Sequence, residues 1–150
     1  MNDRYLFKAK KKNWQELPKD EQWVQGYLFD DGFENGRMFV GGLVVEKYTG
    51  TACDDWTVTG INFYEIDPNT ICRCTGLKDK NGKLIWENDI VNLETDKAVV
   101  IWDRAEWRIK WIKDTIWRKD LHFWTNEDDW KCEVIDNIFD NPELLESEEE

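Results

Sequence analysis

The chain has 150 residues and a formal net charge of −12, with 41% hydrophobic and 35% charged residues. This length matches about one domain, and the composition provides enough apolar material for a core while being too charged for a membrane protein. Nonspecific binding to nucleic acid depends on Lys and Arg that neutralise phosphates, so the acidic balance argues against direct nucleic-acid binding. Residues 146–150, which are nearly all Glu, are expected to form an acidic, flexible tail.

The sequence carries no signal for insertion into or passage across a membrane. No apolar run approaches the roughly 20 residues that span a bilayer, and the first residues lack the apolar stretch of a signal peptide. We therefore expect a cytoplasmic protein without membrane contact, in which the cysteines are reduced thiols.

The N-terminal third contains two predicted strands and is otherwise expected to be irregular. Alternating apolar side chains predict a strand over residues 5–9, and residues 37–48 predict a second strand, broken or bulged at Gly41 and Gly42. Four lysines at and just after the end of the first strand form a basic cluster, which is interpreted as a solvated strand end or loop in preference to a phosphate contact. The cluster consists of Lys8, Lys10, Lys11 and Lys12.

Two hairpins are predicted in the middle of the chain. Residues 56–66 read as a strand, residues 67–69 as a turn, and residues 70–75 as a return strand. The Asn81-Gly82 pair tolerates positive φ at both central positions of a tight turn, so it predicts a second hairpin whose next strand begins at Lys83.

The last third continues the β-rich pattern. Strands are predicted over residues 98–102 and 107–111, joined by a charged turn, and over residues 132–139. Asn141-Pro142-Glu143 predicts a short helix, capped by the Asn and with Pro in its first turn. The predicted fold class is β-rich α+β, with antiparallel strands forming a small barrel or sandwich and a short C-terminal helix.

Two motifs resemble a known family. Residues 74–91, which read Cys-Thr-Gly-Leu-Lys-Asp-Lys-Asn-Gly-Lys-Leu-Ile-Trp-Glu-Asn-Asp-Ile-Val, resemble the signature of YopX-type proteins of bacteriophages and prophages. Residues 133–145 resemble the terminal motif of that family, and residues 5–9 look like its first strand. The resemblance implies one YopX-like domain over residues 1–145, a phage or prophage origin, a place in the bacterial host cytosol, a capacity for self-association, and no established activity.

The first motif has a structural interpretation. Gly76 and Asn81-Gly82 are expected to meet backbone demands, and Asn88, which stands where Gly is common in the family, can adopt the left-handed conformation. Glu87 and Asp89 are expected to bracket a turn. The predicted core residues of the motif are Leu77, Ile85, Ile90 and Val91.

No group of residues matches a catalytic, cofactor or metal site. Cys72 and Cys74 lack zinc-knuckle spacing, and a site that joined them to Cys53, Cys132 or His122 would need an unusual fold, so buried thiols and a packed or half-exposed His122 are the preferred interpretations. Several carboxylates could in principle hold Mg²⁺, but their spacing matches no two-metal or EF-hand arrangement. We predict no enzyme, no cofactor and no metal. The carboxylates considered are Asp54, Asp55, Glu87, Asp89, Asp103 and Glu106.

Two functions remain open. The ten Trp residues favour a noncatalytic protein-interaction or self-assembly domain, with an unidentified protein partner or a homo-oligomer, and the face that carries Trp107 and Trp111 is a candidate contact. The alternative is an acidic inhibitor that mimics DNA and occupies a nucleic-acid-binding host protein. Lys and Arg scattered among the acidic residues, as in residues 103–106 and 118–120, argue against the alternative.

Overall fold

The computed structural model describes residues 3–32, 36–48, 55–94, 96–113, 115, 117–126 and 131–146. Contacts divide the chain into two compact units, which we call the N-terminal unit, residues 5–71, and the C-terminal unit, residues 1–4 with 72–150. The single domain over residues 1–145 and the flexible tail stay predictions. Among the described residues, no helix is long and apolar enough to cross a membrane.

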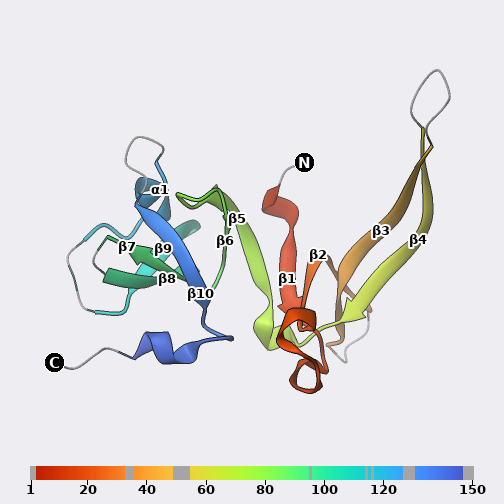
Figure 1. Ribbon diagram of the computed structural model, residues 1–150, viewed down its shortest axis with the longest axis horizontal. Helices are drawn as coiled ribbons and strands as arrows, with labels where there is room; N and C mark the ends of the chain where they lie inside the picture. The colour runs from red at the N-terminus through yellow and green to blue at the C-terminus, as the bar shows by residue number, and fades with distance from the viewer. Residues whose placement is uncertain are drawn as a thin grey trace. The chain divides into compact units, whose positions relative to one another are not determined.

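The N-terminal unit is an antiparallel sheet in which each strand pairs with the next along the chain, in the order β4-β3-β2-β1 (Figure 1). The first third of the chain, expected to be largely irregular, contains three of these strands and three short 3-10 helices. The strands are β1 (Phe7–Lys10), β2 (Trp23–Asp30), β3 (Met38–Tyr48) and β4 (Asp55–Glu65). The 3-10 helices of the first third are η1 (Asp3–Tyr5), η2 (Trp14–Glu16) and η3 (Lys19–Glu21), and a fourth, η4 (Pro68–Thr70), follows β4.

Glycines in β2 and β3 allow neighbouring backbones to approach closely. A Cβ at Gly41 would lie 1.9 Å from the carbonyl oxygen of Asn62, and one at Gly26 would lie 2.4 Å from the carbonyl oxygen of Gly41. β3 runs through its glycines without a break, and the register of the β3–β4 pair shifts between Val44 and Val45 instead. The predicted break at the glycines is therefore wrong, because here the missing side chain serves close packing of strands.

One face of this sheet carries a small core. Ala9, Val40 and Ile66 are buried together, and partly buried side chains from β2 and β3 pack against them. A backbone hydrogen bond joins the end of β1 to the segment after β4, since the N–H of Asp67 donates to the carbonyl oxygen of Lys10 at 2.9 Å.

The C-terminal unit consists of a hairpin, a four-stranded antiparallel sheet in the order β10-β7-β8-β9, and one short α-helix. The hairpin across Asn81-Gly82 is confirmed. The hairpin predicted across residues 67–69 is wrong, because β4 pairs with β3 and β5 pairs with β6. The elements are β5 (Cys72–Lys78), β6 (Leu84–Trp86), β7 (Asp89–Leu93), β8 (Asp96–Asp103), β9 (Glu106–Trp111), α1 (Leu121–Trp124), β10 (Cys132–Asn137) and the 3-10 helix η6 (Pro142–Leu145).

The last third follows the sequence pattern closely. β8 and β9 are joined by a tight turn in which Arg104 and Ala105 have φ of 53° and 60°, so the charged turn is confirmed. The C-terminal helix is present as η6, with Pro142 in its first turn, although the side chain of Asn141 does not cap it. The β-rich fold class with antiparallel strands and a short C-terminal helix is confirmed.

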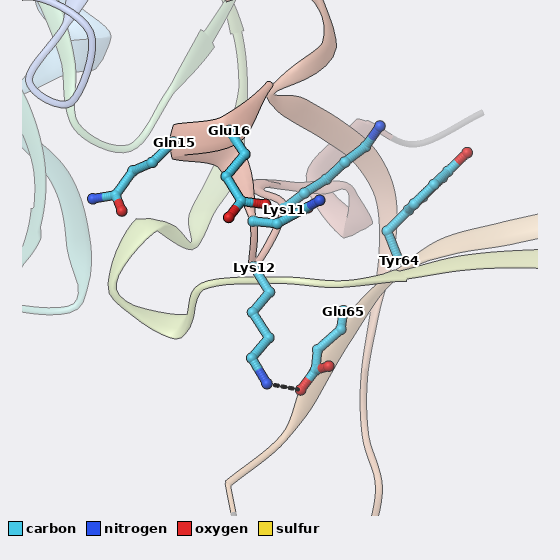
Figure 2. Close-up of a pocket in the computed structure, with 7 residues that line it drawn as sticks. Lys11, Lys12, Gln15, Glu16, Tyr64 and Glu65 are labelled. Atoms are coloured by element: carbon cyan, nitrogen blue, oxygen red, sulfur yellow. Dashed lines mark ion pairs between the residues drawn. The ribbon is translucent and has the colours of Figure 1, made fainter. Parts of the chain in front are cut away.

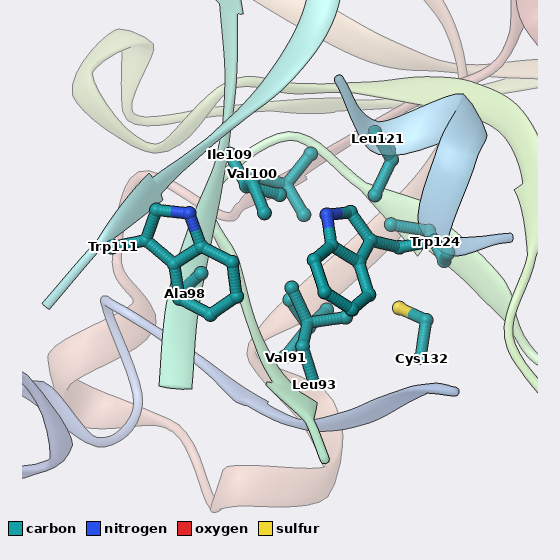
Figure 3. Packing of buried hydrophobic residues seen from close by; sticks show 10 residues of the cluster. Val91, Leu93, Ala98, Val100, Ile109, Trp111, Leu121, Trp124 and Cys132 are labelled. Atoms are coloured by element: carbon teal, nitrogen blue, oxygen red, sulfur yellow. The ribbon is translucent and has the colours of Figure 1, made fainter. Parts of the chain in front are cut away.

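The core of the C-terminal unit lies between the four-stranded sheet, the β5–β6 hairpin and α1. Ile85 of the hairpin is buried in it, so the layers are sandwich-like, and the sheet is open and does not close into a barrel. The indole rings of Trp111 and Trp124 meet edge to face at its centre, with centroids 5.5 Å apart (Figure 3). The buried members are Ile85, Val91, Leu93, Ala98, Val100, Ile109, Trp111, Leu121, Trp124 and Cys132.

The face that carries Trp107 and Trp111 was expected to be a contact with another protein, and the packing of this core contradicts that expectation. The alternation that places both side chains on one face is confirmed, but Trp111 is buried and Trp107 packs against the core cluster. α1, which the sequence analysis did not predict, packs against β9. The face is thus part of the core, and the proposed contact through Trp107 and Trp111 is wrong.

The two central Trp residues differ in their hydrogen bonding, which gives a stability prediction. Trp124 Nε1 donates to the carbonyl oxygen of Arg118 at 3.0 Å, whereas Trp111 Nε1 is buried and has no hydrogen-bond partner among the described residues. Replacing Trp124 by Phe breaks a bond, and replacing Trp111 by Phe removes an unpaired donor. We expect Trp124→Phe to lose about 1–3 kcal/mol more unfolding free energy than Trp111→Phe in urea titrations. Equal losses would show that the Trp124 bond makes no net contribution.

Candidate interaction surface

The described cysteines are buried thiols. Cys72, Cys74 and Cys132 are buried and in no disulfide among the described residues, and the burial pattern of β5 places Cys72 and Cys74 on the same face, as predicted. Cys53 lies outside the described residues. In the part of the chain that the structure describes, no group of three or more His, Cys, Asp or Glu residues could hold a metal ion.

The other candidate site residues do not form one cluster. His122 is exposed on α1, where a packed or half-exposed side chain was predicted. The Oδ2 of Asp89 accepts the backbone N–H of Trp86 at 2.8 Å, and Glu87 pairs with Arg73 at 3.4 Å. Asp103 and Glu106 are cross-strand partners at the β8–β9 turn, and the side chains of Asp54 and Asp55 lie outside the described part.

Asp79 holds the hairpin of the first motif in place. Its buried carboxylate accepts the backbone N–H groups of Asn81 and Lys83 through Oδ1 and that of Val134 through Oδ2, each at 2.9 Å. In the Asn81-Gly82 pair, which was singled out because it tolerates positive φ, only Gly82 has a positive φ, 78°. The motif therefore joins the β5–β6 turn to β10, which supports its structural interpretation.

The second turn of the motif also depends on backbone geometry. Asn88 has φ of 71°, which confirms the left-handed conformation, and it lies between Glu87 and Asp89 as expected. Its N–H donates to the carbonyl oxygen of Val100, and its carbonyl oxygen accepts the N–H of Ile138. The predicted core residues are confirmed, with Ile85, Ile90 and Val91 buried and Leu77 packed against the core.

The lysines at the end of β1 contact aromatic rings or a carboxylate. Lys10 is buried, not solvated as predicted, with its Nζ 4.0 Å from the ring centroid of Trp14. The Nζ of Lys11 lies 4.3 Å from the ring centroid of Tyr64, and Lys12 pairs with Glu65 at 3.5 Å. These two lysines line a pocket of about 500 Å³ together with Glu65 and a second carboxylate, Glu16, so the pocket carries no excess charge (Figure 2).

Glu65, the last residue of β4, is favoured in its ionised form. The hydrogen bond from Arg37 Nε at 3.1 Å, together with the charges of Arg37 and Lys12, holds the pKa of Glu65 below its usual value. The carboxylate therefore remains available to both cations.

Beyond the end of β2, strands β3 and β4 continue as a two-stranded ribbon (Figure 1). β2 pairs only with residues 38–41 of β3, so residues 42–48 and 55–62 have no other strand beside them in the described part of the unit. We call this ribbon the arm. Both of its edges present backbone groups without a strand partner among the described residues, which is the usual starting point for pairing with another chain.

The arm exposes large apolar side chains. Leu43 and Ile61 are cross-strand partners and therefore share a face, and their side chains are 62% and 67% exposed. Val58, on the same strand as Ile61, is 55% exposed, and Val44 is exposed as well. On the unit's sheet, the exposed Phe29 continues this apolar surface. Exposed apolar side chains grouped in this way indicate a contact surface.

The comparison with protein families agrees with the motifs. The YopX protein family matches residues 41–146, which is more than half of the chain. The chain belongs to the YopX family. The match covers the arm as well as the two motifs, so the arm is part of the YopX-like region.

One solved structure has a similar fold. The crystal structure of protein EF1440 from Enterococcus faecalis has a TM-score of 0.52 and 20% sequence identity, covering 93% of this chain and 96% of that chain. At this identity the likeness shows the fold. No curated protein matches the chain.

The three bonds to Asp79 give the second stability prediction. In Asp79→Asn, an NH₂ group replaces one of the two carboxylate oxygens. Because this NH₂ group is a donor, it cannot accept the backbone N–H that it would face. We expect a loss of about 1–3 kcal/mol of unfolding free energy in urea titrations. The matched control is Asp103→Asn, at an exposed position of the same unit. Equal stability of the two variants would contradict a structural role of the Asp79 carboxylate.

Cys132 gives a prediction about pH. Burial, with the charges of Asp79 and Asp89 nearby, raises the pKa of the Cys132 thiol from 9.0 to about 12. The folded state therefore holds this proton at pH values where the unfolded chain has released it, so stability falls as pH rises through that interval and is unaffected below it. We expect wild type to lose up to about 1.4 kcal/mol per pH unit more than Cys132→Ala above the unfolded-state pKa.

Urea titrations at neutral and alkaline pH measure this difference. The smaller side chain in Cys132→Ala lowers stability by the same amount at every pH, so only the slope against pH is compared. Parallel slopes for wild type and Cys132→Ala would contradict the raised pKa.

Proposed function

We propose that this protein is a noncatalytic interaction domain of phage or prophage type that assembles with other copies of its own chain through the arm. The observation that supports the proposal is the exposed Leu43 and Ile61 pair on a ribbon without a further strand partner in the described residues. Because both edges of the arm are unpaired there, a strand of another chain can add to either edge.

Association would stabilise the arm itself. A two-stranded ribbon is at best marginally stable alone in water. Burying a Leu or Ile side chain contributes about 1.5–3 kcal/mol, so covering Leu43 and Ile61 together favours assembly by several kcal/mol before entropy losses.

The charge distribution is compatible with contact at this place. The chain carries a net charge of −12, which repels other copies. The arm residues whose side chains are described are all uncharged: Gly42, Leu43, Val44, Val58, Thr59, Gly60, Ile61 and Asn62. Contact through these eight residues therefore brings no charged side chain of one copy directly against a like charge.

Light scattering coupled to size-exclusion chromatography tests the proposal. We expect wild type to have a molar mass several times that of the chain, and Leu43→Thr combined with Ile61→Thr to be monomeric. Thr keeps the preference for strands while removing apolar contact area. The matched control is Ile135→Thr combined with Leu145→Thr, which changes two exposed aliphatic side chains of the C-terminal unit and should keep the wild-type mass.

Circular dichroism and a urea titration confirm that each variant is folded before its mass is interpreted. A monomeric wild type would overturn self-assembly. An arm variant that is folded and keeps the wild-type mass would overturn the arm as the contact.

A further inference from the structure

A second surface feature, in the C-terminal unit, is positively charged, whereas the described side chains of the arm are uncharged. A pocket of about 300 Å³ lies beside the β8–β9 hairpin and the segment that follows it. Five cationic residues line it, with one carboxylate, and we call it the basic pocket. Its charged residues are Arg104, Arg108, Lys110, Lys113, Lys119 and Asp103.

The fold brings these cations together from separated parts of the sequence. Ile109 and Trp111 point into the core, so strand alternation places Arg108 and Lys110 on the opposite face of β9. The backbone N–H of Ile109 donates to the carbonyl oxygen of Lys119 at 2.8 Å, which fixes the later segment beside the strand. Arg104 lies in the β8–β9 turn.

Within the described part of the chain, neighbouring groups leave most of this positive charge without an ion pair. Arg108 forms an ion pair with Glu106. The nearby carboxylate of Asp120 forms an ion pair with Arg118, which does not line the pocket. Among the described residues, the remaining four cations of the pocket form no ion pair, and Asp103 is the one carboxylate that lines it. The pocket therefore carries a local positive excess in a chain whose net charge is −12.

We propose that the basic pocket binds a small polyphosphate anion, the chemistry of pyrophosphate or of the phosphate chain of a nucleotide. Unpaired cations held near one another repel, and an anion that carries several charges relieves this repulsion. Arg and Lys both bind phosphate oxygens through charge-assisted hydrogen bonds. The volume lies at the lower end of the range for small-molecule sites, which favours a compact ligand. An extended nucleic-acid strand would also meet the acidic remainder of the chain.

Isothermal titration calorimetry with sodium pyrophosphate tests this proposal on the full chain. The variant is Lys110→Gln combined with Lys119→Gln, both exposed positions in the pocket. The matched control is Lys83→Gln combined with Lys97→Gln, two exposed lysines elsewhere in the same unit, which changes the net charge equally. We expect saturable binding to wild type, a weakening of about tenfold or more in the pocket variant, and a change of less than about twofold in the control.

Two further titrations distinguish the sources of the phosphate. ATP that binds with the same dependence on Lys110 and Lys119 supports the pocket as a nucleotide phosphate site. A single-stranded oligonucleotide that binds while pyrophosphate does not would overturn the proposal in favour of a nucleic-acid contact. Absence of pyrophosphate binding to wild type, or equal weakening in the pocket and control variants, would also overturn it.

Discussion

The buried carboxylate of Asp79 joins three backbone N–H groups from segments that are more than fifty residues apart, at Asn81 and Lys83 in the turn and at Val134 in β10. These bonds fix the β5–β6 hairpin against the sheet, so Ile85 enters the same core as Trp111. Because the core takes the odd-numbered side chains of β9, the even-numbered ones must face outward. Burial of Ile109 and Trp111 in the core therefore leaves Arg108 and Lys110 to face the basic pocket.

Local backbone chemistry could be predicted from the sequence, but strand partners could not. The Asn81-Gly82 hairpin and the left-handed Asn88 were predicted correctly because a turn needs a residue that tolerates its φ, and that requirement is visible in one segment. The turn at residues 67–69 is equally visible and yet leads to no hairpin, because a turn signal indicates a reversal and not which strand will lie alongside. The same holds for Gly41, whose role depends on the distant backbone of Asn62.

The surfaces were harder to predict than the fold. A strand that contains Leu43 or Ile61 looks like any buried strand, and only the end of β2 leaves the arm uncovered. Trp107 and Trp111 were wrongly expected to form an exposed contact. Alternation shows which side chains share a face, but not whether a helix covers that face. The cations of the basic pocket were present in the sequence as alternating residues of β9, but Lys119 joins them through a backbone bond, and the net charge of the chain conceals the local excess.

The two proposals predict opposite responses to salt, so the role of the arm and the role of the basic pocket can be tested separately. Assembly through the arm works against repulsion between acidic copies, so screening of charge should strengthen it. Phosphate binding depends on attraction to unpaired cations, so the same screening should weaken it. The two features also belong to different units, the arm to residues 5–71 and the basic pocket to residues 72–150. A change in ionic strength that moved both in the same direction would contradict the charge argument for one of the two sites.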